Sequence, residues 1–319
     1  MITARNYAAK AVRDLELISK TLSKEEKEDG YIVSLVAKEI EKSQHFVMPD
    51  GGKILDTHLS SLSGLPARLP YKSISIEFFQ EEIKGQKGKG PLKFVILAME
   101  SQENLDFINK ITMKSDTKDL LDENVNRGSL FIAFCYENNA NLFQGSRRFV
   151  LHPHAVVIPR QWESPESKIT DVRIRRMATP ILRGVVKRMS SAGEYDINNV
   201  HVDTAFATMS VLYLCEALSC SNVSTRILEA VDLRVNRKRV AKGKLPLYET
   251  KLLVVPSKPY SNKEDAEDPD GIKRNSPREH LRRGHIRRLD EHRRIWINSC
   301  VVGNHNDGRI DKTYLVLGE

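Results

Sequence analysis

Hydrophobic residues at three-to-four spacing open the chain and predict two helices. Residues 3–22 place apolar side chains such as Ala8 and Leu15 on one side, as an amphipathic helix requires. Residues 23–26 read Ser-Lys-Glu-Glu, the form of a capping box, and predict the start of a second helix. That helix is expected to end near Ser43. The chain is therefore predicted to begin with a helical pair.

The hydrophobic period then shortens to two, which is typical of strands. Residues 73–78 alternate between apolar and polar side chains and predict a half-buried strand. Residues 93–98 and 129–134 are more continuously apolar and predict central strands. Residues 148–151 and 155–158 are expected to extend the same sheet.

The second half of the chain alternates between helical and extended patterns. Residues 203–219 form the most apolar helical segment and are expected to be the core helix. Residues 171–190 are predicted to form a helix with a basic face, broken or kinked by its proline. Strands are predicted at residues 250–255, 295–297 and 313–317.

Together these elements predict an α+β fold. N-terminal helices lead into a mainly antiparallel central sheet that packs on the core helix, and a basic, strand-rich module follows. We expect one domain over residues 1–165, with a role in recognising a peptide or protein, and a second over residues 166–319. An acidic, polar stretch at about residues 257–276 is expected to be a flexible connector.

Composition favours a globular protein of the cytoplasm. Of the 319 residues, 40% are hydrophobic, and no apolar run approaches the roughly 20 residues that cross a bilayer. Residues 1–6 lack the basic-then-apolar layout of a signal peptide, and we predict no membrane partner. The four cysteines show none of the paired spacing of a structural zinc site, so we predict no metal and no cofactor. Zinc held by dispersed His and Cys side chains stays an alternative.

Positive charge is concentrated in two segments. Residues 226–251 carry eight basic and three acidic residues, and residues 273–294 carry nine basic and three acidic residues. The net charges of these segments, +5 and +6, together exceed the +8 of the whole chain. The remainder is therefore slightly negative, and the excess is local. A local basic surface is what a polyanionic partner requires.

The first basic segment offers five candidate phosphate contacts: Arg237, Lys238, Arg239, Lys242 and Lys244. Two interpretations stay open for them. They belong either to a solvated loop before the strand at 250–255 or to a turn that contacts phosphate. The presence of a second basic segment favours the phosphate-contacting turn.

The second basic segment is almost purely arginine, and the guanidinium fork binds phosphate in a bidentate manner. Its candidate nucleic-acid contacts are Arg278, Arg282, Arg283, Arg287, Arg288, Arg293 and Arg294, with Trp296 as a ring for stacking on a base. A tryptophan in a strand is more often a core residue. Strand and helix both stay open for residues 280–288, and Gly284 argues for a turn or a close backbone approach.

His280 and His285 flank an arginine pair and are candidates for catalysis. One histidine would take the proton from a 2′-hydroxyl of RNA while the other protonates the leaving oxygen, and no metal would be needed. Arginine would stabilise the charge of the transition state. The alternative is that both histidines only hydrogen-bond or contact phosphate.

The motif His280-x-Arg282-Arg283-Gly284-His285 is followed by a Trp-containing strand and by Val302-Gly303. This arrangement resembles the C-terminal end of a type V-A anti-CRISPR protein and its relatives in phages and plasmids. An Asn-Arg-Lys-Arg…Gly-x-x-Pro element at residues 236–246 is similar to one that phage relatives often carry. The resemblance covers about residues 236–303, and Ile286 stands where the anti-CRISPR often has an aromatic residue.

The resemblance implies a protein that recognises a nascent peptide on the ribosome and lowers production of a defence nuclease by loss of its message. RNA or the ribosome would then be the partner of the basic module, and a nascent peptide or protein would be the target. An exposed sheet edge is expected to suit such a peptide, by strand addition.

Three functional hypotheses follow. The leading one is a regulatory protein of a phage or plasmid, in the cytoplasm of the bacterium that carries it. It would bind RNA or the translation machinery through the basic C-terminal module and down-regulate a host defence target. The second is a metal-independent endoribonuclease that uses His280 and His285. The third is a DNA-binding phage protein without catalytic activity.

Overall fold

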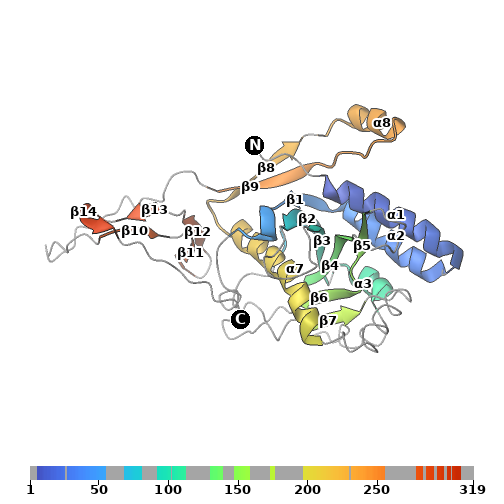
Figure 1. Cartoon of the computed structure of the whole chain (residues 1–319), viewed down its shortest axis with the longest axis horizontal. Coiled ribbons are helices and arrows are strands. Elements are labelled where there is room, and N and C mark those ends of the chain that lie inside the picture. Colours follow the sequence, from blue (N-terminus) through green and yellow to red (C-terminus); the bar gives the residue numbers. More distant parts are fainter. Residues whose placement is uncertain are drawn as a thin grey trace. The chain divides into compact units, whose positions relative to one another are not determined.

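The computed structural model of the chain has an α+β fold (Figure 1). It describes residues 6–25, 27–54, 68–80, 92–101, 103–112, 130–138, 147–158, 173–176, 197–229, 231–255, 278–282, 285–290, 293–297, 300–302 and 304–309. The chain divides into two compact units: unit 1, Met1–Glu216 with Thr225–Leu252, and unit 2, Ala217–Ser224 with Leu253–Glu319. The expected division near residue 165 differs from this one, because the core helix joins the sheet in unit 1.

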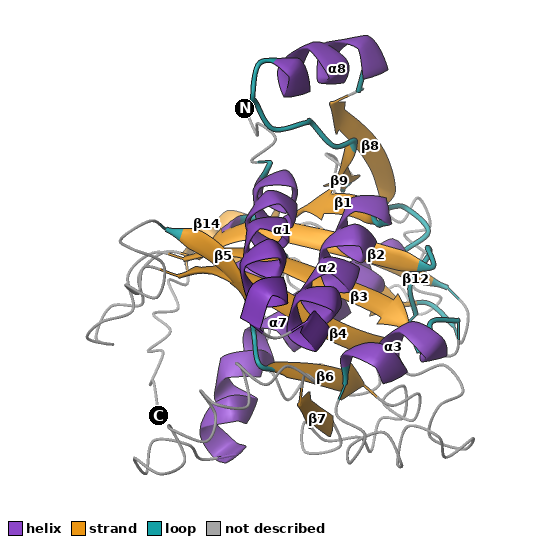
Figure 2. Cartoon of the chain, turned by 90° about the vertical axis from the view of Figure 1, so that its right-hand side faces the viewer, coloured by secondary structure: helices purple, strands orange, loops and turns teal. Residues whose placement is uncertain are grey.

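Nine strands form one sheet in the part of the chain that the structure describes (Figure 2). Their order is β7-β6-β4-β3-β2-β1-β9-β8, and β5 also pairs with β4. The strands span Gln44–Val47 (β1), Ser73–Gln80 (β2), Leu92–Glu100 (β3), Leu130–Asn138 (β4), Arg148–Leu151 (β5), His154–Ile158 (β6), Arg173–Arg176 (β7), Ser224–Glu229 (β8) and Thr250–Val254 (β9).

The sheet is mainly antiparallel, as the sequence predicts. β2, β3 and β4 pair antiparallel over most of their length, with Ile76 opposite Ile96 and Ile96 opposite Phe134. β4 then pairs with β5 at one end and with β6 at the other. β1 is the exception, because it runs parallel to both β2 and β9.

Helices cover one face of the sheet. α1 spans Tyr7–Glu25, α2 spans Lys27–Lys42 and the short α3 spans Leu105–Ile111. Their apolar side chains form one core cluster with the side chains of β3 and β4 on that face, including Val95 and Leu97. The predicted helical pair is thus confirmed.

The opposite face of the sheet is covered by α7, which spans Ile197–Leu218 and confirms the predicted core helix (Figures 1 and 2). The ring of Phe206 in α7 lies 4.3 Å from the ring centroid of Phe94 and 5.3 Å from that of Phe134. Because successive side chains of a strand point to opposite faces, two-sided burial explains why β3 and β4 are continuously apolar.

Gly52 allows the segment after β1 to approach α7. It lies in a short 3₁₀ turn, Asp50–Gly52, and has φ of +63°. A Cβ atom at this position would lie 2.2 Å from Ser210 Oγ and 3.0 Å from the ring of Phe78. Both the backbone conformation and the close packing therefore require glycine.

A buried carboxylate fixes the start of α1 to the sheet. Glu77 of β2 is only 3% exposed. Its oxygens accept hydrogen bonds from the backbone N–H groups of Asn6 (3.1 Å) and Ala8 (3.0 Å). These N–H groups lack partners within the helix, and a negative charge at a helix N-terminus is favourable.

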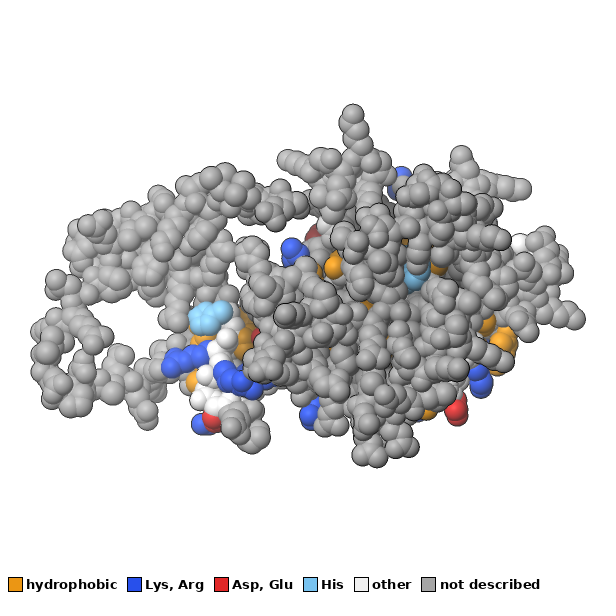
Figure 3. Space-filling model, turned by 90° about the horizontal axis from the view of Figure 1, so that it is seen from below, with side chains coloured by type: hydrophobic (Ala, Val, Ile, Leu, Met, Phe, Trp, Pro, Cys, Tyr) orange, Lys and Arg blue, Asp and Glu red, His pale blue; other side chains and the backbone are white. Residues whose placement is uncertain are grey.

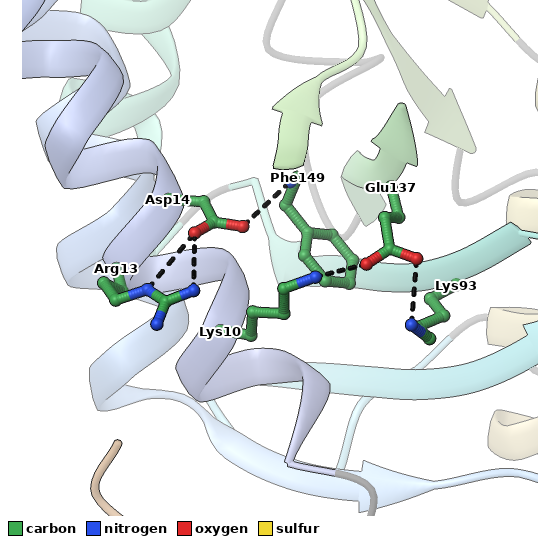
Figure 4. A network of polar contacts seen from close by, with 6 residues as sticks. All are labelled: Lys10, Arg13, Asp14, Lys93, Glu137 and Phe149. Atoms are coloured by element: carbon green, nitrogen blue, oxygen red, sulfur yellow. Dashed lines mark hydrogen bonds and ion pairs between the residues drawn. The ribbon is translucent and has the colours of Figure 1, made fainter. Parts of the chain in front are cut away.

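Two more buried carboxylates join α1 to the sheet (Figure 4). Asp14 accepts a hydrogen bond from the backbone N–H of Phe149 in β5 (3.1 Å). Glu137 of β4 accepts hydrogen bonds from Lys10 of α1 and from Lys93 of β3 (2.9 Å). Burial acts to raise the pKa of Glu137, but the two lysines outweigh it and hold that pKa below its ordinary value.

Unit 2 contains two small groups of strands. β10 (Arg278–Arg282) pairs with β13 (Cys300–Val302) and with β14 (Asn304–Arg309). β11 (His285–Arg288) pairs antiparallel with β12 (Arg294–Ile297). Of the two conformations left open for residues 280–288, the strand is confirmed, and it is divided into two strands.

Two local predictions are wrong. α1 runs to Glu25, so residues 23–25 of the expected capping box continue the first helix instead of starting the second. Within the helix predicted at residues 171–190, Arg173–Arg176 form β7, where Ile174 lies opposite Val156 and extends the sheet.

Several other predictions concern residues that the structure does not describe. The rest of the helix expected at residues 171–190, the connector at 257–276 and the strand at 313–317 lie outside the described residues. Among the helices that the structure describes, none has the length and apolar character that a bilayer crossing requires.

We predict that Glu137→Gln lowers the free energy of unfolding by about 2 kcal/mol at pH 7, as is usual for hydrogen bonds to a charged group. The lowered pKa of Glu137 stabilises the fold fully above the ordinary value of 4.5, and this contribution is lost as pH falls through the lowered value. The difference between wild type and variant should therefore shrink in acid. Urea unfolding at several pH values measures it, with the exposed Glu103→Gln as a control that should match wild type at every pH.

Candidate nucleic-acid interface

Part of the first basic segment forms a helix, which corrects the expected loop or turn for Arg237, Lys238 and Arg239, whereas Lys242 and Lys244 follow the helix in a turn and loop. α8 spans Leu233–Ala241 and none of its residues is buried. It lies between β8 and β9, which end the sheet order, and projects beyond the sheet away from the other helices (Figures 1 and 2). We call residues 232–249, which contain α8 and the segment that leads to β9, the arm.

Both ends of α8 are capped. At the N-terminus, the Asp232 carboxylate accepts a hydrogen bond of 2.7 Å from the backbone N–H of Arg234. At the C-terminus, the N–H groups of Gly243 and Lys244 donate to the carbonyls of Val240 and Arg239, both at 2.9 Å. Gly243 has φ of +69°, so these bonds form a Schellman motif with glycine in its usual place.

The segment after α8 folds back along the helix and is bonded to it. The Asn236 amide donates to the Leu247 carbonyl (2.8 Å) and accepts from the Leu247 N–H (2.9 Å). Arg239 Nε donates to the Leu245 carbonyl (2.9 Å). These bonds hold one side of the helix, so they fix its shape without a hydrophobic core.

The base of the arm is anchored to the sheet and to the start of α1 in the same unit. The Asn6 amide donates to the Pro246 carbonyl at 3.0 Å. The ring of Tyr248 stacks on that of His45 at a centroid distance of 4.5 Å. His45 is itself buried and contacts Ser75, and burial lowers its pKa to about 4. The arm therefore rests on a neutral, packed base.

The arm carries a dense positive charge. Six basic side chains lie within thirteen residues, against the single acid Asp232: Arg234, Arg237, Lys238, Arg239, Lys242 and Lys244. Five of them are exposed, and Arg239 is half-buried. Within the described part of the chain, no ion pair joins any of the six to a carboxylate. Like charges four residues apart, such as Arg234 and Lys238, repel each other on a helix.

The second basic segment places arginines on the β11–β12 hairpin of unit 2. Arg287 and Arg288 are exposed and Arg294 is half-buried. Basic side chains and a histidine gather here in the space-filling view (Figure 3). Arg293, although exposed, forms an ion pair with Asp290 across the turn. Of the predicted contacts in this hairpin, Arg293 is therefore already partly neutralised.

The two candidate catalytic histidines lie on different strands. His280 is in β10, opposite Val302, whereas His285 is in β11, opposite Ile297. His285 is half-buried. These two strands belong to separate groups of hydrogen-bonded strands. The two histidines are therefore close in sequence but do not face each other across a strand pair. Arg278 and Arg282 also lie in β10, and Arg283 is outside the described residues.

Trp296 belongs to the interior of unit 2. It is 6% exposed, and its neighbours Ile295 and Ile297 are also buried. Its backbone N–H donates to the side chain of Asn222 (2.8 Å), whose amide donates back to the Trp296 carbonyl (2.9 Å). Burial of the ring argues against stacking on a base, so we no longer assign that role to Trp296.

Comparison with protein-family models, with curated proteins and with solved structures finds no match to this chain. Sequence reasoning missed Arg234, which precedes the Asn-Arg-Lys-Arg string, although Asp232 and Gly243 were visible signals of a helix between them.

We predict that Asn236→Ala loosens α8 while leaving the rest of unit 1 unchanged, because it removes both hydrogen bonds to Leu247. Amide hydrogen exchange over residues 234–244 should accelerate by about tenfold, the effect of roughly 1.4 kcal/mol. Exchange in β3 and β4 should not change. Unaltered exchange in the helix would show that the caps alone hold it. Val235→Ala, an exposed position in the same helix, is the control.

Proposed function

We propose that the chain binds RNA through two cationic surfaces, the arm of unit 1 and the β11–β12 hairpin of unit 2. The observation that carries the proposal is α8, a capped helix with no buried residue and six basic side chains in and just after it. A helix of this length is marginal by itself in water. Caps and side-chain bonds hold it in an exposed position where repulsion between like charges opposes it, and a polyanionic partner would relieve that repulsion.

The chemistry of the arm suits a phosphate backbone. Four of the six cations are within or directly after the last turn of α8, where the helix dipole also favours positive charge. Exposed Leu233 (71%) and Val240 (57%) flank Arg237 at helical spacing. They place aliphatic groups beside the charges, where the sugars and bases of a nucleic acid could pack against them. Phosphate contacts of this kind give affinity without sequence choice.

The resemblance of residues 236–303 to the anti-CRISPR relatives supports RNA over DNA and suggests the setting. On that basis we propose a regulatory protein of a phage or plasmid whose RNA partner is a message or the ribosome, and whose target is a host defence function. The charge alone would suit duplex DNA as well as RNA. Binding measurements with an RNA probe and with a DNA probe separate these two possibilities.

Reversing charge on α8 tests the proposal. We predict that Arg237→Glu combined with Lys238→Glu weakens binding of single-stranded RNA by at least about tenfold at moderate salt, since each phosphate contact contributes through counterion release. Fluorescence anisotropy with a labelled RNA, and with a DNA duplex in parallel, measures the affinity. Both side chains are exposed, so the fold should be unaffected.

The matched control is Lys20→Glu combined with Lys38→Glu. These exposed lysines lie in α1 and α2 of the same unit, and their reversal changes the net charge by the same amount. The control should lose much less affinity than the α8 variant. Equal losses would mean that net charge and not the arm governs binding, and tighter binding of the duplex DNA would favour the DNA-binding alternative.

A further inference from the structure

The β11–β12 hairpin places two arginines directly opposite each other. In its antiparallel register, Arg288 pairs with Arg294 and Ile286 pairs with Trp296. Directly opposite residues have Cβ atoms about 4.5–5.5 Å apart on one face of the ladder. Arg288 and Arg294 therefore extend from the same face, next to the pair formed by Ile286 and Trp296.

The described residues around this arginine pair do not neutralise it. In the described part of unit 2, no ion pair joins Arg288 or Arg294 to a carboxylate. Asp290, the described acid in the turn between the two arginines, is engaged by the side chain and the N–H of Arg293. Like charges directly opposite each other destabilise a β ladder. The hairpin thus keeps a repulsive pair that a single acidic substitution would remove.

The strand that carries Arg294 is held firmly. The Arg294 carbonyl accepts a hydrogen bond from the Ser221 N–H (3.0 Å), and Asn222 bonds both backbone groups of Trp296. Ile295, Trp296 and Ile297 are buried. The backbone positions of the two arginines are therefore set before any ligand arrives, and preorganisation of this kind lowers the entropic cost of binding.

We propose that Arg288 and Arg294 form a clamp for one phosphodiester group of the bound RNA. Each planar guanidinium donates two parallel hydrogen bonds to phosphate oxygens, and a phosphate between the two would turn their repulsion into attraction. Arg287 is one residue away and extends from the opposite face, so it lies outside the clamp. The clamp deepens the proposed function and rests on it.

Arg288→Glu and Arg287→Glu test the clamp as a matched pair, because both residues are exposed on the same strand and the charge change is identical. In the full chain, Arg288→Glu should weaken binding of single-stranded RNA by about tenfold more than Arg287→Glu, the loss expected for a bidentate charged contact. Equal losses would overturn the clamp. The wild-type affinity and the α8 variant, measured in the same series, show separately whether the protein binds RNA.

Thermal unfolding of the same variants without RNA gives an independent readout. Arg288→Glu puts opposite charges across the ladder and should raise the melting temperature relative to Arg287→Glu. A lower or equal melting temperature would mean that the two arginines do not repel each other, and the clamp would be overturned even if RNA binds. If the wild-type chain has no affinity for RNA, both the clamp and the proposed function fail.

Discussion

Burial of β3 and β4 on both faces is the constraint on which the rest of unit 1 depends. Strands that are apolar on both sides need two covering layers, and α1 with α2 supplies one while α7 supplies the other. The buried carboxylates Glu77 and Glu137 join α1 to the strands with charged hydrogen bonds. The sheet is thereby a rigid platform, and its far edge at β9 and β8 is free to carry an element that has no part in the core.

The arm is built by a different principle from the platform. α8 buries no residue, so its shape comes from the Asp232 cap, the Gly243 Schellman motif and the Asn236 bridge to Leu247. Asn222 makes a similar two-way bridge to Trp296 in unit 2. In both places an asparagine amide bonds the backbone N–H and carbonyl of one residue, Leu247 or Trp296. Both of the segments held in this way carry arginine. Local hydrogen bonding therefore holds cationic elements that hydrophobic burial leaves exposed.

The spacing of hydrophobic residues was sufficient to predict α1, α2, α7 and the main strands. These elements are held by burial, which requires apolar side chains at regular positions along the sequence. This spacing failed for Arg173–Arg176, where four residues with one apolar side chain pair with β6 at the edge of the sheet. The basic arm was expected as a loop or turn because Lys and Arg carry no periodic signal, although its two capping residues were present. Trp296 is buried and its backbone bonds to Asn222, about seventy positions earlier, a pairing that no local pattern reveals.

The salt dependence of RNA binding tests the central claim most directly, since that claim is electrostatic. The affinity of the full chain for a single-stranded RNA should be measured over a series of potassium chloride concentrations. If the arm and hairpin together neutralise at least three phosphates, the logarithm of the association constant should fall with the logarithm of salt at a slope of about −2 or steeper. A slope near zero, or no binding at the lowest salt concentration, would contradict the account.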